Sequence, residues 1–125
     1  LNVHEGPHSI SPLAGTPRGR TPIRPGMITS NEPGYYKTGH FGIRTENLIL
    51  CVDSEYSKPD APFYAFETLT LFPIDQSLIF WDLMETEEIT WLNNYHQEVY
   101  QKLSPQLNEE ERAWLAEKCQ AVGIE

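Results

Sequence analysis

Apolar residues follow two different periods along the chain, which divides it into a strand-rich part and a helical part. Residues 42–54 (GIRTENLILCVDS) form the most strand-like run, and residues 63–74 (FYAFETLTLFPI) alternate in part until Pro73. Both runs are typical of strands, and residues 57–62 (SKPDAP) predict a turn between them. Strands followed by helices predict an α+β fold with antiparallel strands.

The helical period begins at Thr86 and continues to Ser104–Pro105, which predicts one helix. Asn108 is a plausible N-cap for a second helix, with acidic residues 109–111 in its first turn and Gly123 at its end. Its apolar side and that of the first helix contain three large aromatic residues. These residues could lie in the core or form an interface: Trp91, Tyr95 and Trp114.

A loop rich in proline, glycine and arginine (PLAGTPRGRTPIRPG) occupies residues 12–26. It cannot form a helix or a central strand. Its arginines, Arg18, Arg20 and Arg24, could bind phosphate or a substrate carboxylate, or they could simply be solvated.

The charge distribution excludes some classes of function. The formal net charge is −9, from 18 acidic and 9 basic residues, which argues against nucleic-acid binding. No apolar run approaches the ~18 residues that a membrane span requires. Cys51 and Cys119 lack CxxC spacing, so we predict two reduced, buried cysteines and a cytoplasmic location. Because the chain starts at LNVHEG without methionine, we expect a processed product or a piece of a longer protein.

Two glutamates are placed symmetrically about a glycine. Glu32 and Glu46 lie seven residues on either side of Gly39. If residues 27–36 and 42–52 form a hairpin around residue 39, position i pairs with position 78 − i, and the two carboxylates face each other. Such a pair is destabilising unless a cation or proton lies between them, so the spacing indicates a metal site.

Two alternatives remain open for these acids. Pro33 and Gly34 interrupt the first strand, and a slip of one residue would send one acid to the opposite face. Surface ion pairs of Glu32 with Lys37 or an arginine, and of Glu46 with Arg44, would also account for the spacing. Neither alternative requires a metal.

Histidine supplies the other candidate for chemistry. His4 could be a structural residue, or a neutral imidazole beside a metal-bound substrate. His8 has no comparable pattern around it, and His40 falls in the proposed turn, where we expect it to be exposed.

Three motifs resemble those of a known enzyme family. The segments NVHEGP (residues 2–7), GMITSNEPGYY (26–36) and FGIRTEN (41–47) resemble the C-terminal motifs of Xaa-Pro aminopeptidases. More closely, they resemble the aminopeptidase P branch of the creatinase-like "pita-bread" metallopeptidases. The segments FETLTLFPID (66–75) and WLNNYH (91–96) are similar to the tail of the longer aminopeptidase P proteins.

The resemblance implies the C-terminal portion of a pita-bread fold. Residues 1–75 would be the C-terminal part of the metallopeptidase catalytic domain, and residues 76–125 a helical extension of aminopeptidase P type. It also implies hydrolysis: the enzyme removes the first residue from peptides with proline in second position. A homodimer is implied as well, since the tail of such proteins contributes dimer contacts.

The resemblance assigns roles to individual residues. Glu32 would be a metal ligand and the general base, and Glu46 would bridge two divalent ions, which are commonly manganese in that family. His4 would lie near the scissile carbonyl and stabilise the developing charge. Arg44, on the same strand face as Glu46, would orient the carboxylates.

The match is incomplete. In the family, two aspartates and a further metal-binding histidine precede the NVHEG motif, and Asp53 and Asp60 do not fit their places. We therefore expect this chain alone to be inactive and at best a weak metal binder. The alternative function is a non-catalytic dimerisation or protein-binding module derived from such a peptidase.

Overall fold

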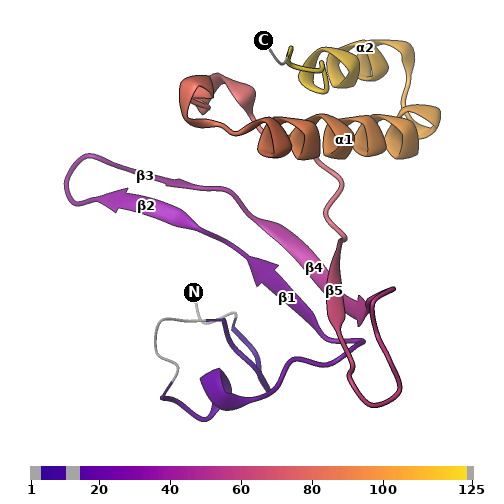
Figure 1. The fold of residues 1–125 in the computed structure, drawn as a ribbon. Coiled ribbons are helices and arrows are strands. Elements are labelled where there is room, and N and C mark those ends of the chain that lie inside the picture. Colours follow the sequence, from indigo (N-terminus) through magenta and orange to yellow (C-terminus); the bar gives the residue numbers. More distant parts are fainter. Residues whose placement is uncertain (1–3, 11–14, 124–125) are drawn as a thin grey trace. The chain divides into compact units, whose positions relative to one another are not determined.

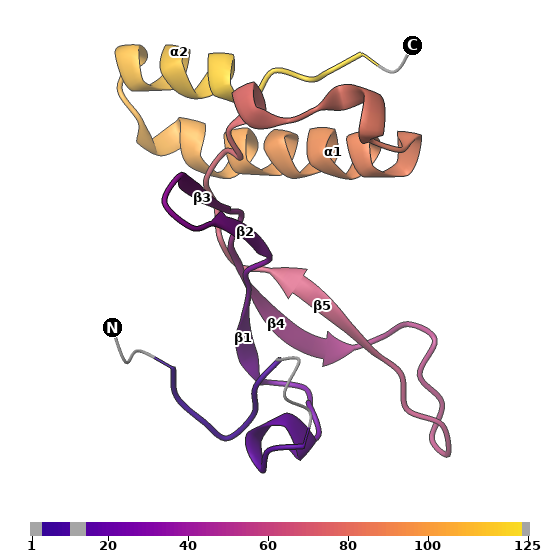
Figure 2. The same ribbon diagram turned by 90° about the vertical axis from the view of Figure 1, so that its left-hand side faces the viewer.

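The computed structural model describes residues 4–10 and 15–123, which form two compact units (Figures 1 and 2). The first unit ends at Thr70 and the second begins at Leu71. Among the described residues, the first unit contains the five strands and the second contains the two α-helices. The predicted α+β order, antiparallel strands followed by two helices, is confirmed.

The first unit consists of two antiparallel sheets along one long hairpin (Figure 1). The three-stranded sheet has the order β1-β4-β5, and β2 pairs with β3 alone. The strands are β1 (Ile28–Asn31), β2 (Gly34–Lys37), β3 (Phe41–Arg44), β4 (Asn47–Asp53) and β5 (Tyr64–Thr68). The predicted continuous strand from residue 42 to residue 54 is therefore wrong in one respect, because it is divided between β3 and β4.

The predicted register of the hairpin is confirmed on both sides of this division. Ile28 lies opposite Leu50 in the β1–β4 pair, and Tyr36 lies opposite Gly42 in the β2–β3 pair. Each pair obeys the 78 − i rule, so Pro33 interrupts the ladder without shifting it. Gly39 has φ 72° in the turn, a conformation that glycine adopts without strain. His40 is exposed there, as predicted.

The strand predicted over residues 63–74 ends early, at Thr68. The backbone N–H of Leu69 still donates to the Leu48 carbonyl at 2.8 Å. The Leu48 N–H, however, donates to the side-chain hydroxyl of Thr70 at 2.8 Å rather than to a backbone carbonyl. A side chain thus replaces the backbone acceptor, and the ladder stops before Pro73 is reached.

The proline-rich loop is tied to the N-terminal segment. Residues Arg18–Arg20 form a short 3₁₀ helix, η1, so the prediction that this loop contains no helix is wrong for these residues. The Ser9 N–H donates to the Arg18 carbonyl at 3.2 Å, and the Thr21 hydroxyl donates to the Pro7 carbonyl at 3.1 Å. Residues 7–9 therefore lie alongside residues 18–21. Residues 11–14 of the predicted loop and residues 2–3 of the NVHEGP motif lie outside the described residues.

The second unit is built around α1 (Thr86–Leu103) and α2 (Glu109–Lys118), with η2 (Gln76–Leu78), η3 (Trp81–Leu83) and η4 (Ser104–Gln106) beside them. Both predicted helix starts are confirmed. Glu85 and Glu88 form a capping box on α1, and Asn108 forms one with Glu111 on α2. Each box satisfies backbone N–H groups that the first helical turn leaves unpaired.

The predicted end of the second helix at Gly123 is wrong, because α2 ends at Lys118. Beyond it, the Asn93 side chain makes two hydrogen bonds with the Val122 backbone, to its N–H and its carbonyl, each at 2.9 Å. These bonds hold Val122 against α1 and out of the α2 ladder.

Tyr95, Val99 and Leu115 form the core of the second unit, with Leu92 and His96 also buried. Of the three aromatic residues that could lie in the core or at an interface, the structure places Tyr95 in the core. Tyr95 is buried, whereas Trp91 and Trp114 are 51% and 46% exposed. Cys51 is buried as predicted, but Cys119 is only partly buried, and both are free thiols. None of the described helices has the length and apolar character to cross a bilayer.

Candidate active site

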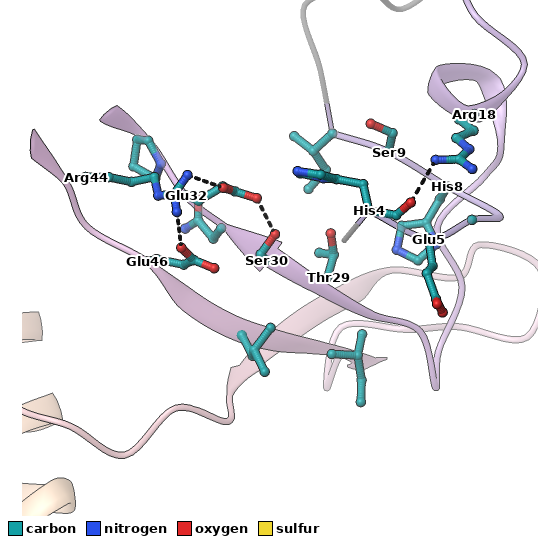
Figure 3. Close-up of a pocket in the computed structure, with 16 residues that line it drawn as sticks. His4, Glu5, His8, Ser9, Arg18, Thr29, Ser30, Glu32, Arg44 and Glu46 are labelled. Atoms are coloured by element: carbon teal, nitrogen blue, oxygen red, sulfur yellow. Dashed lines mark hydrogen bonds and ion pairs between the residues drawn. The ribbon is translucent and has the colours of Figure 1, made fainter. Parts of the chain in front are cut away.

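A pocket of about 1220 Å³ lies in the first unit, between the N-terminal segment and the long hairpin (Figure 3). Among its lining residues are His4, Glu32, Arg44 and Glu46. The four candidate site residues from the sequence therefore share one pocket.

Glu32 and Glu46 lie at the interruption between the two sheets. The Thr45 N–H donates to the Pro33 carbonyl at 3.2 Å, which carries the 78 − i register through the interruption. The two glutamates are consequently opposite each other on one face. The alternative of a one-residue slip is excluded for this hairpin.

Arg44 joins the two carboxylates. Its Nη1 lies 3.0 Å from Oε2 of Glu32, and its Nη2 lies 3.1 Å from Oε2 of Glu46. The guanidinium thus supplies the cation that facing carboxylates require, and its planar fork suits two acceptors at once. The alternative of ion pairs is realised with this arginine for both acids, and it coexists with the convergence of the acids.

Tyr36 lies beside Arg44 on the same face of the hairpin. A Cβ added to Gly34 would lie 2.7 Å from the Tyr36 hydroxyl oxygen, and one added to Gly42 would lie 2.7 Å from ring atom Cδ1. Only glycine at these two positions leaves room for the ring. Tyr36, then Glu46 and Glu32, raise the pKa of Arg44.

Ser30 fixes the other oxygen of Glu32. Its hydroxyl donates to Oε1 at 2.6 Å, and this bond is the main reason why the pKa of Glu32 lies below its usual value. Burial opposes this effect by raising the pKa, and the charges of Arg44 and then His4 lower the pKa by smaller amounts. Glu32 is therefore ionised at neutral pH. Ser30 was not among the predicted site residues. Its position two residues before Glu32 places both side chains on the same strand face, which could have predicted this contact.

His4 has an exposed side chain at the pocket wall. Its side chain is therefore not part of a buried core. Its backbone carbonyl accepts a hydrogen bond from Nη1 of Arg18 at 3.3 Å. His8 also lines the pocket, and among the described residues its buried Nδ1 has no hydrogen-bond partner. No pattern around His8 in the sequence predicted this position.

The donor set is suited to part of a metal centre. Two facing carboxylates offer the oxygen ligands that hard divalent cations prefer. Within residues 4–10 and 15–123, however, no three His, Cys, Asp or Glu side chains cluster closely enough to hold an ion. Glu32 and Glu46 therefore fit two ligands of a divalent-ion site, and this part of the chain supplies no third.

Two family models match consecutive parts of the chain. The model described as "Metallopeptidase family M24" matches residues 1–53, which include the hairpin and the pocket. The model described as the C-terminal region of peptidase M24 matches residues 62–122, which include both helices of the second unit.

Similar proteins bear related names. An "Aminopeptidase P2" of Arabidopsis thaliana is 49% identical over 109 residues, which are 86% of this chain and 15% of that protein. A "Probable Xaa-Pro aminopeptidase P" of Laccaria bicolor is 42% identical over 123 residues, covering 95% of this chain and 19% of that protein. The chain thus spans about a fifth or less of the length of these relatives.

A solved structure shares the fold. It is an X-prolyl aminopeptidase from Caenorhabditis elegans, described as a cytosolic enzyme with a di-nuclear active site. The TM-score is 0.77 and the sequence identity 34%, with coverage of 98% of this chain and 20% of that one.

Proposed function

This chain belongs to metallopeptidase family M24, as a C-terminal fragment of the catalytic domain of an Xaa-Pro aminopeptidase P, and from that premise we propose how it works. The longer protein removes the first residue from peptides that carry proline in second position. Residues 1–125 contribute one wall of its active site. The single observation that supports this proposal is the convergence of Glu32, Glu46 and Arg44 on the pocket that His4 also lines.

The two carboxylates hold cations in this proposal. Two divalent ions, manganese by the family resemblance, would polarise the scissile carbonyl and activate the attacking water when bound. Glu32 and Glu46 would each offer a carboxylate to them. Arg44 would orient both groups, since it already binds one oxygen of each.

In this proposal Glu32 accepts a proton during the reaction, and His4 donates a hydrogen bond. The lowered pKa of Glu32 keeps its carboxylate free of a proton at neutral pH, so it can accept one from the attacking water. His4 would donate a hydrogen bond to the oxygen that becomes negative in the transition state, where such a bond is most effective. The exposed position of its ring supports access to a substrate.

Further features belong to the same proposal. We expect a cytosolic homodimer, with exposed aromatic residues such as Trp91 and Trp114 available at an interface. We also expect residues 1–125 alone to be inactive, because two carboxylates are too few to retain two ions.

The test uses the full-length protein and its Glu46→Gln variant. The wild type should release the first residue of an X-Pro peptide with added Mn²⁺, and the variant should lose activity by ~10³-fold or more. Glu67→Gln is the matched control, because Glu67 is also an exposed acid on a strand of the first unit but does not line the pocket. Metal content, measured on the same samples, should fall only in Glu46→Gln.

Two results would contradict the proposal. Wild-type protein that binds Mn²⁺ but cleaves no X-Pro peptide would favour the non-catalytic dimerisation or binding module. Measurable turnover by residues 1–125 alone would show that the remaining ligands are not needed.

A further inference from the structure

The pocket has two ends of different charge character. Glu32, Arg44 and Glu46 form the carboxylate end, and Glu5, His8 and Arg18 form what we call the arginine end (Figure 3). In that view Ser30, Thr29 and His4 lie between the two ends. A bound peptide whose scissile bond lies near His4 and the carboxylate end therefore has room to continue towards Arg18.

Arg18 is held in place by backbone contacts. Its carbonyl accepts the Ser9 N–H at 3.2 Å, and its Nη1 donates to the His4 carbonyl at 3.3 Å. Its Nε lies 3.7 Å from the position that a Cβ on Gly6 would occupy. The guanidinium is thus laid along residues 4–6 rather than extended into solvent.

The charge of Arg18 is not neutralised within the described residues. The ion pairs found there involve Arg44, Lys102 and Lys118, and none involves Arg18, although Glu5 lines the same end. A guanidinium that donates one N–H to a carbonyl still has further N–H groups that can donate to a planar, anionic acceptor.

His8 supplies a second, independent observation at this end. Its Nδ1 is buried, and the described residues offer it no hydrogen-bond partner. Buried polar atoms are nearly always paired, so an unpaired one that lines the same pocket as Arg18 indicates a place where a polar ligand group completes the bonding.

We propose that Arg18 binds the C-terminal carboxylate of short peptide substrates. A free carboxylate is the anionic group that every unmodified peptide carries, and it lies at the opposite end from the residue that is removed. Arg18 would then select for short X-Pro peptides whose carboxylate reaches it. This inference rests on the proposed function, because it places the scissile bond at the carboxylate end.

The test compares free acids with amides in the full-length protein. The substrates are Ala-Pro, Ala-Pro-Ala and their C-terminal amides. Wild type should show a lower KM for the acid than for the amide at one of these two lengths. Arg18→Ala should abolish this preference, raising the KM of the acid ~10-fold or more, as loss of a charged hydrogen bond predicts, with the amide changed less than about twofold.

Arg20→Ala is the matched control. Arg20 lies in the same 3₁₀ helix but does not line the pocket, so it should leave both constants unchanged. Arg18→Lys should keep part of the preference, because it retains the charge without the planar fork.

An equal loss on acid and amide in Arg18→Ala would overturn the inference, since it would mean that Arg18 acts only by holding the His4 backbone. Equal KM values for acid and amide in the wild type would overturn it as well, while leaving the aminopeptidase function intact.

A binding measurement separates the two proposals. Calorimetric titration of the same acids and amides into metal-free protein measures their binding at the arginine end in the absence of turnover. Preferential binding of an acid that is lost in Arg18→Ala, in a protein that cleaves no X-Pro peptide even with added Mn²⁺, would support this inference and contradict the proposed function.

Discussion

The two units of this chain are stabilised in different ways. The second unit encloses a core of Tyr95, Val99 and Leu115, packed between α1 and α2. In the first unit, among the described residues, only Cys51 is buried, while Ile28, Leu48 and Phe66 remain 46–52% exposed. The helical unit is thus organised by apolar burial, and the strand unit by hydrogen-bond register and a charged cluster.

The difference shows where function is placed. Apolar burial supplies most folding free energy, and the unit that has it carries none of the proposed site residues. The unit that presents Glu32, Arg44 and Glu46 leaves its apolar strand faces uncovered, as expected of a surface that packs against other protein. Predictions that compare equivalent changes in the two units test this contrast.

The largest effect on stability is expected in the helical core. Leu115→Ala should lower the free energy of unfolding of the second unit by about 2–5 kcal/mol, because Leu115 is 1% exposed and its loss leaves a cavity. Leu48→Ala, the same change at a 46% exposed site of the first unit, should cost less than about 1 kcal/mol. Denaturant titration followed by tryptophan fluorescence and circular dichroism measures both. Equal costs would remove the contrast between the units.

A smaller effect on stability is expected at the hairpin, where a steric clash rather than the loss of apolar burial sets the free-energy cost. Gly42→Ala should destabilise the first unit by about 1–3 kcal/mol, because the new Cβ would meet the Tyr36 ring at 2.7 Å. Gly15→Ala is the control, since a Cβ there meets nothing within 4 Å. Hydrogen exchange of the β2–β3 amides reports the change locally. Unchanged protection in Gly42→Ala would mean that Tyr36 moves aside freely.

The smallest effect is a pH dependence confined to the second unit. His96 is fully buried, and its Nε2 accepts the Ile74 N–H at 3.0 Å. Burial lowers the pKa of His96 below its usual 6.5. A lowered histidine pKa stabilises the folded state above pH 6.5, and this contribution is lost as the pH falls from there towards the folded-state pKa.

The measurement is the midpoint of denaturant unfolding between pH 7.5 and pH 5. The midpoint of the second unit should fall across this range, and the fall should be smaller in His96→Gln, which cannot be protonated. The surface pair Glu98–Lys102 is a suitable comparison, because disrupting it by Lys102→Ala should not alter the pH dependence. An identical slope in His96→Gln would assign the effect to other groups.

The sequence by itself determined the family and much of the local structure. The NVHEGP, GMITSNEPGYY and FGIRTEN motifs identified the Xaa-Pro aminopeptidase family, which the family models, the relatives and the fold of the nematode enzyme confirm. The start of the first helix followed from its helical period, that of the second from the capping residue Asn108, and the hairpin register from counting about Gly39. These features depend on residues close to one another along the chain.

Tertiary structure decided the rest. Asn93 ends α2 by bonding to Val122, 29 residues away, and Thr70 ends β5 by taking the Leu48 N–H, 22 residues away. In the same way, Arg18 and His8 became pocket residues only because hydrogen bonds bring residues 7–9 beside residues 18–21. Such contacts join groups with no periodic relation in the sequence. A pattern can therefore predict that Glu32 and Glu46 face each other, but only the folded chain shows that Arg44 binds both.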